Sequence, residues 1–139
     1  MKSRSQTGQA IVEFAFVLPI LLLMILGIIE FSLLLYDKAV ITNASREGAR
    51  VGIVAQDRSN ISAINTTISD AVNNYCRNNV ISFGSTTVTI PAPAWSGYTF
   101  GDSLTVTVNF NYTWLVLPHF ISGFGSAKQI TASTKMRLE

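Results

Sequence analysis

The chain of 139 residues has room for one membrane anchor and one small domain, because a folded domain usually takes about 100 to 150 residues. Its formal net charge of +2 is small and its basic residues are scattered, which argues against a nucleic-acid partner. With one cysteine (Cys76) and one histidine (His119), it can form neither an intramolecular disulfide nor a standard zinc site. We therefore expect no metal and no cofactor.

The first forty residues contain an apolar segment of membrane length. Residues 14–29 carry no charge, and the apolar character resumes after Glu30 as far as Tyr36. As an α-helix, residues 11–36 would span about 39 Å, more than the roughly 30 Å of a hydrocarbon core. No A-x-A-like cleavage site follows, so a transmembrane helix over residues 9–36 is favoured over a secretory signal peptide.

The charges that flank this segment predict its orientation. Lys2 and Arg4 precede it with no acidic residue among the first eight positions, whereas Asp37 and Lys38 follow it as a balanced pair. Basic residues are retained on the cytoplasmic side of a membrane. We expect the N-terminus inside and residues from about 37 onward outside.

Two carboxylates interrupt or border the apolar segment. Glu13 lies about one turn inside it, where an unpaired carboxylate costs on the order of 3 kcal/mol if it reaches the membrane centre, unless the side chain extends to the nearby surface. Glu30 lies about 25 Å further along the helix, near the outer interface. For Glu30, a solvated interface position is favoured over a contact between subunits.

The residues around Glu13 resemble a type IV prepilin processing site. Gly8 is followed by Gln9, and Glu13 and Phe14 occupy the fifth and sixth positions after the glycine. The run Gly-Gln-Ala-Ile-Val-Glu-Phe is similar to the TadE-like pseudopilins of the tight adherence (Tad, Flp pilus) system. The similarity continues through residues 18–19, 27–31 and 42–50, so it covers about the first fifty residues strongly.

The resemblance implies a processing site and an assembly site. A membrane prepilin peptidase would cut between Gly8 and Gln9 and remove a cytoplasmic leader, residues 1–8. A glycine has no Cβ atom to clash in a protease cleft. In related pilins the fifth-position glutamate pairs with the N-terminal amine of a neighbouring subunit. Here that role would fall to Glu13, with Phe14 beside it, and the pair would set the register between helices.

The resemblance also implies partners and a location. The expected partners are membrane lipid, the prepilin peptidase, other pilins or pseudopilins, and the inner-membrane assembly platform of the Tad system. The expected location is a bacterial cytoplasmic membrane, crossed once, with the C-terminal domain in the periplasm or at the cell surface.

Residues 37–56 are predicted to continue the helix as an exposed stem. Ala44, Gly48 and Gly52 are four residues apart and share one face, a spacing that lets a second helix approach closely. They are a possible helix-packing face. The alternative is a weak helix that ends near Gly52, because glycine inside a helix costs about 1 kcal/mol relative to alanine.

A charged cluster lies on the same predicted stem. Arg46, Glu47 and Arg50 are neighbours by i,i+3 and i,i+4 spacing. They most simply form a solvated face, and the resemblance raises the alternative that they line a subunit contact.

Residues 57–139 are predicted to form an exported α+β domain. After the polar residues 56–60, apolar residues recur at helical intervals and indicate an amphipathic helix that ends near residues 78–79: Ile61, Ile64, Ile68, Val72 and Tyr75. Alternating patterns then predict strands over residues 86–90, 104–114 and 129–138. We expect a pilin-like fold, with this helix packed on a small three-stranded antiparallel sheet and with Cys76 buried beside its apolar stripe.

The connection over residues 115–125 is unusually apolar for a surface loop. It is predicted to close one end of the core, and the alternative is contact with lipid or another subunit. Phe120 and Phe124 are the possible subunit contacts in that case. His119 has no evident partner, so a structural role is favoured over catalysis.

No catalytic motif, phosphate loop or paired-carboxylate spacing occurs in the chain, so we expect neither an enzyme nor a small-molecule substrate. The first functional hypothesis is a minor pseudopilin that joins, primes or caps a pilus through its N-terminal helix. The alternative is a permanently anchored single-pass protein whose outer domain binds a partner or supports the secretion machinery.

Overall fold

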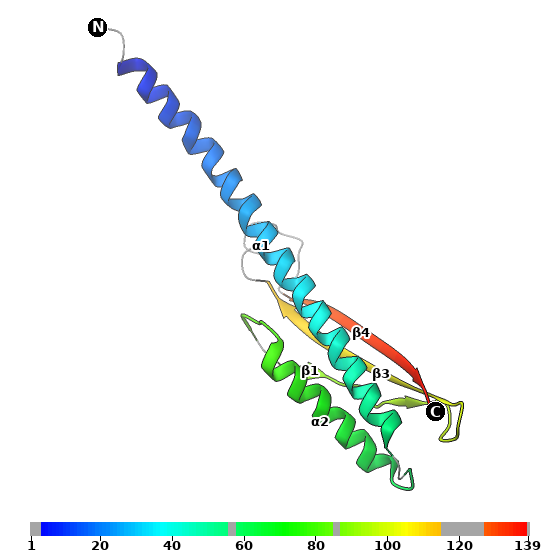
Figure 1. The fold of residues 1–139 in the computed structure, drawn as a ribbon. Coiled ribbons are helices and arrows are strands. Elements are labelled where there is room, and N and C mark those ends of the chain that lie inside the picture. The colour runs from blue at the N-terminus through cyan, green and yellow to red at the C-terminus, as the bar shows by residue number, and fades with distance from the viewer. Residues whose placement is uncertain (1–3, 56–57, 85–86, 115–126, 139) are drawn as a thin grey trace.

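The computed structural model describes residues 4–55, 58–84, 87–114 and 127–138 (Figure 1). Within these ranges two helices precede four strands: α1 (Arg4–Val54), α2 (Ile61–Asn79), β1 (Val88–Thr89), β2 (Ala94–Trp95), β3 (Ser103–Thr113) and β4 (Ala127–Arg137). The predicted α+β class is confirmed, with a long N-terminal apolar helix, a second helix and an antiparallel sheet.

Helix α1 determines the shape of the molecule. It has 51 residues, so it is about 76 Å long at 1.5 Å per residue, and Pro19 lies within it. Its N-terminal half projects away from everything else, whereas its C-terminal half lies along the sheet with α2 beside it (Figure 1). The projecting segment and the packed segment are therefore parts of one continuous helix.

Helix α2 begins and ends where the sequence predicted. Oδ1 of Asn60 accepts a hydrogen bond from the backbone N–H of Ala63 at 3.1 Å, which caps the first turn. The helix ends at Asn79, and Val80 is extended. Its buried residues are four apart on one face, as the apolar stripe requires: Ile64, Ile68, Val72 and Cys76.

The sheet is centred on β3. Strand β4 pairs with β3 over its full length, from Ser103 opposite Arg137 to Thr113 opposite Ala127. The short strands β1 and β2 both pair with the other edge of β3, and every pairing is antiparallel. The sequence predicted three strands and missed β2, because a two-residue strand one residue after Pro93 has no alternating pattern to detect.

The core lies between the sheet and both helices. Strand β3 buries its alternate side chains, as predicted: Leu104, Val106, Val108, Phe110 and Tyr112. Residues 37–54 continue the helix, but one face of this segment is buried, and Ile41, Ala44 and Ala49 are fully covered. The segment is thus part of the domain rather than an exposed stem. Helix α1 packs on β3 and β4, and α2 packs beside α1 and contributes its buried face to the same core.

Residues 96–102 connect β2 to β3 and include a turn over residues 99–102, in which the backbone N–H of Asp102 donates to the carbonyl of Thr99 at 3.1 Å. The backbone N–H of Ser96 donates to the carbonyl of Ser103 at 2.9 Å, and Gly101 has a φ of 92°, which favours glycine. Phe100 at the tip of this turn is 83% exposed.

Candidate membrane and assembly site

The N-terminal half of α1 is apolar on every side. From Gly8 to Ile29 its side chains are exposed, except that Gly27 is half-buried, and an 18-residue window of the helix has a mean hydropathy of 2.7 with none of it buried. A helix of this kind in a globular protein lies inside a core. The described residues provide no such core here, so this helix fits a single pass through a membrane.

The predicted processing residues lie at the start of this exposed segment. Gly8 and Gln9 are both exposed and helical, and a Cβ atom on Gly8 would meet no atom within 4 Å. Space around the peptide is therefore available, but the bond between the two residues lies inside a helix. A peptidase that binds extended substrates would have to unwind it.

Glu13 and Phe14 face the surroundings of the helix. Together with Ala10 and Val17 they line a shallow hollow to which α1 alone contributes. Glu13 is exposed and forms no hydrogen bond or ion pair with the side chains that the structure describes. Among the residues that the structure describes, none pairs with this carboxylate, which faces the surroundings of the helix.

The face of Ala44, Gly48 and Gly52 is occupied within the same chain. A Cβ atom on Gly48 would lie 2.6 Å from Cγ2 of Val72, and one on Gly52 would lie 2.3 Å from Cδ2 of Leu104. Helix α2 and strand β3 thus pack where these glycines leave room, and Ala44 is fully buried. No surface remains there for another subunit.

The charged cluster lies on the outer side of α1. Nε and Nη2 of Arg50 donate to the two carboxylate oxygens of Glu47 at 2.8 and 2.6 Å, and Arg46 donates to Oδ1 of Asn43 at 3.5 Å. The hydrogen bonds and positive charge of Arg50 hold the pKa of Glu47 below its ordinary value. An exposed ion pair of this kind adds little stability. The cluster is solvated in this chain, and its role as a subunit contact stays a prediction.

The junction between the projecting helix and the domain contains a carboxylate whose position the sequence did not predict correctly. Glu30 is 2% exposed, so the predicted solvated position is wrong. The domain packs against α1 from this residue onward. The Tyr112 hydroxyl donates to the Glu30 carbonyl oxygen at 3.4 Å. The rings of Trp114 and Phe31 pack edge to face, with their centroids 6.2 Å apart. Burial, followed by the charges of Glu30 and Asp37, raises the pKa of Tyr112 to about 12.

Asp37 is a second buried carboxylate at this junction. It is fully covered, and Oδ1 accepts the backbone N–H of Ile81 at 2.9 Å, whereas Oδ2 has no hydrogen-bond partner in the part of the chain that the structure describes. Burial raises the pKa of Asp37, and the Ile81 N–H partly offsets this effect. Sequence reasoning used Asp37 only as a flanking charge. The sequence did contain a signal for its position. Asp37 is seven residues from Glu30, a spacing that places both carboxylates on one face of the helix.

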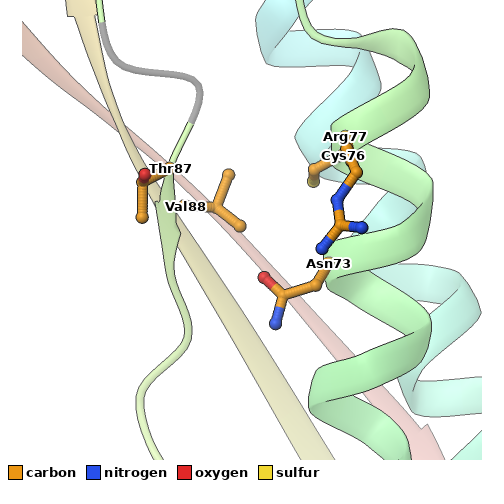
Figure 2. A pocket seen from close by; sticks show the side chains of 5 residues that line it. All are labelled: Asn73, Cys76, Arg77, Thr87 and Val88. Carbon is orange, nitrogen blue, oxygen red and sulfur yellow. The ribbon is translucent and has the colours of Figure 1, made fainter.

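A pocket of about 160 Å³ opens between α2 and β1, lined by Asn73, Cys76, Arg77, Thr87 and Val88 (Figure 2). The Cys76 thiol is 1% exposed, and burial raises its pKa to about 11, so it is a poor nucleophile at neutral pH. Among the described residues, no three His, Cys, Asp or Glu side chains cluster so that they could hold a metal ion. His119, Phe120 and Phe124 lie outside the described residues.

Comparison with known proteins adds one finding. Residues 8–50 match the model of the TadE-like protein family. No curated protein and no solved structure matches the chain. The matched stretch contains the exposed apolar helix, Glu13 and the beginning of the segment that packs in the domain.

Proposed function

The chain is TadE-like over residues 8–50, and we propose that it is a minor pseudopilin, a structural and assembly component of a bacterial Flp (Tad) type IVb pilus. In this proposal a prepilin peptidase cuts after Gly8, and the chain then joins, primes or caps the pilus through its N-terminal helix. The observation that carries the proposal is the exposed apolar half of α1, with Glu13 close to its N-terminal end and no partner for it among the described side chains.

The membrane holds the precursor in the orientation that processing needs. Lys2 and Arg4 keep the leader in the cytoplasm, and the domain is exported on the other side. Gly8 weakens the helix at the scissile bond by about 1 kcal/mol relative to alanine, which assists local unwinding. Cleavage then gives Gln9 a charged amine at the end of a fully exposed helix.

Glu13 supports assembly because its carboxylate has no positively charged partner among the described side chains. A carboxylate at the edge of the hydrocarbon region is costly unless it finds a positive partner or water. An ion pair with the Gln9 amine of a neighbouring subunit would lower the desolvation cost of both charged groups. The same pair would fix the axial register between the two helices. Phe14 and Val17, which line the same hollow, would pack against that neighbour.

The alternative function is a permanently anchored single-pass protein whose outer domain binds a partner or supports the secretion machinery. One observation favours it: residues 4–9 are helical, so the bond between Gly8 and Gln9 is not presented as an extended peptide. A chain that keeps its leader would remain in the membrane.

Mass spectrometry of the protein extracted from native membranes separates the two functions. Processing predicts an N-terminus at Gln9 in cells with the prepilin peptidase and an intact leader in cells without it. A Gly8→Val variant should stay uncut, whereas Gly27→Ala, at an open position elsewhere in the helix, should be cut normally. Retention of residues 1–8 in native cells would reject the pseudopilin proposal and support the anchored protein.

A further inference from the structure

The exposed apolar part of α1 ends where the domain begins. Residues 11–29 give a helix of about 28 Å, close to the roughly 30 Å of a hydrocarbon core. The next residue, Glu30, is already buried against the domain. No exposed length of helix separates the membrane from the domain, so the near end of the domain has to lie at the membrane surface.

The near end of the domain can be identified from contacts along β3. Tyr112 and Trp114, at the C-terminal end of β3, contact Glu30 and Phe31. A Cβ atom on Gly84 would lie 2.6 Å from Oγ1 of Thr113, so the segment that follows α2 lies beside the same end of β3. Figure 1 shows the C-terminal end of α2 and the end of β3 near the point where α1 leaves the domain.

This end exposes large apolar side chains. Phe31 and Tyr36 on α1 are 52% and 45% exposed, and Ile81 and Phe83 after α2 are 42% and 51% exposed. We call these four residues the collar. Tyr is enriched where a protein meets the headgroup region, because its ring is apolar and its hydroxyl is polar. Phe and other large apolar side chains at a membrane surface are buried about 5 to 10 Å into the boundary between headgroups and acyl chains.

The charges at this end are compatible with a membrane surface. Arg77 in the last turn of α2 and Lys128, paired in register with Tyr112, are exposed, whereas Glu30 and Asp37 are buried. Exposed basic groups are attracted to anionic lipid headgroups, and burial of the two carboxylates removes the nearest source of repulsion.

We propose that the collar lies in the headgroup region of the membrane that α1 crosses, so that the domain rests on the lipid surface instead of standing away from it. The occupant of this apolar surface is lipid, because the collar is continuous with the transmembrane part of α1. The headgroup region is about 5 to 8 Å deep on each side. Along the helix axis Phe31 lies about 3 Å and Tyr36 about 10 Å beyond Ile29, and helical side chains lean toward the N-terminus, here toward the membrane, which brings the Tyr36 ring closer to the headgroups. The proposal requires that α1 spans the membrane, but it does not depend on processing or pilus assembly.

The test places a fluorescent probe on the full chain in vesicles of phosphatidylethanolamine and phosphatidylglycerol. In a Cys76→Ala background, Phe83→Cys carries an environment-sensitive nitrobenzoxadiazole label, and some of the lipid carries a nitroxide at a shallow acyl position. Tyr36→Cys gives a second collar position in case the first variant folds poorly. Phe100→Cys is the matched control, because Phe100 is exposed in the turn before β3, about 35 Å away along that strand. Ile20→Cys, at the middle of residues 11–29, reports insertion of the helix in a parallel vesicle sample whose lipid carries the nitroxide at a deep acyl position.

We expect the label at position 83 or 36 to be quenched by the shallow nitroxide at least about twofold more than the label at position 100, as an interfacial belt requires. Quenching at position 20 together with equal, weak quenching at positions 83, 36 and 100 would overturn the proposal while leaving the membrane anchor intact. Loss of quenching at position 20 as well would reject the anchor and the proposal together.

Discussion

Gly52 of α1 and Leu104 of β3 approach so closely that a Cβ atom on Gly52 would lie 2.3 Å from Cδ2 of the leucine. Cδ1 of Ile68 would be 2.8 Å from the same atom, and both neighbouring side chains are fully buried. The absence of a side chain at Gly52 therefore sets how near α1 can come to α2 and the sheet. Since α1 also contains the exposed apolar segment, this contact lies on the same helix that connects that segment to the domain.

Replacing Gly52 with leucine should separate these elements. We expect Gly52→Leu to lower the free energy of unfolding of the domain by about 1 to 3 kcal/mol, the usual range for overpacking a buried site. Thermal unfolding in detergent micelles, followed by circular dichroism, measures the change. Gly27→Leu is the matched control, because a Cβ atom there meets nothing within 4 Å. Equal stability of the two variants would contradict the observed packing.

Cys76 is expected to be unreactive in the folded protein. Its thiol is 1% exposed with a pKa of about 11, so at pH 8 its thiolate population is lower than that of an ordinary cysteine by about two orders of magnitude. Maleimide or dithionitrobenzoate labelling at pH 8 should therefore be slow in the native protein and fast after addition of denaturant. Rapid native labelling would show that the pocket beside β1 opens widely enough to expose the sulfur.

Asp37 should make the domain less stable as pH rises. Its pKa is raised in the folded state, so the folded protein holds this proton more tightly than the unfolded chain does. The contribution of Asp37 to stability is therefore most favourable below the ordinary value of 3.8 and is lost as pH rises through the raised folded pKa. The buried negative charge is thus a cost at neutral pH.

The Asp37→Asn variant tests this assignment. Asparagine keeps an oxygen that can accept the Ile81 N–H but carries no charge, so we expect a melting temperature a few degrees higher at pH 8 and no gain below pH 3.8. Asp70→Asn, an exposed change on α2, is the control and should have little effect. If Asp37→Asn raised the melting temperature equally at all pH values, burial of the Asp37 charge would not be the cause.

Periodic patterns predicted the elements of this fold that extend over many residues. The stripe of α2 and the alternation of β3 each repeat a simple spacing, and the capping Asn60 marks the start of a helix. Strand β2 has two residues, and β1 was predicted longer than it is, because pairing of such short segments is decided by the neighbouring strand β3.

Sequence spacing could not assign the partners of buried polar residues. Glu30 contacts Tyr112, 82 positions later, and Asp37 contacts Ile81, 44 positions later. Neither pair shares a local pattern, so the sequence placed Glu30 at a solvated interface and treated Asp37 only as a flanking charge. The Gly48 and Gly52 spacing indicated a close approach, but only the tertiary fold identifies α2 and β3 as the elements that fill the space.

Glu13 is the residue on which the proposed assembly depends. It lies on an exposed apolar helix without a partner among the described side chains, so Glu13→Ala should leave membrane insertion and cleavage after Gly8 unchanged. Recovery of the variant in purified pili should fall by about tenfold or more, as expected if losing the charge pair costs at least about 1.4 kcal/mol per contact. Quantitative mass spectrometry of membrane and pilus fractions measures both steps. Asp70→Ala is the control for loss of one carboxylate, since Asp70 is exposed on α2 and belongs to neither candidate contact surface. Normal incorporation of the Glu13 variant would remove Glu13 from the assembly mechanism, whereas failure to insert would show that the carboxylate acts before assembly.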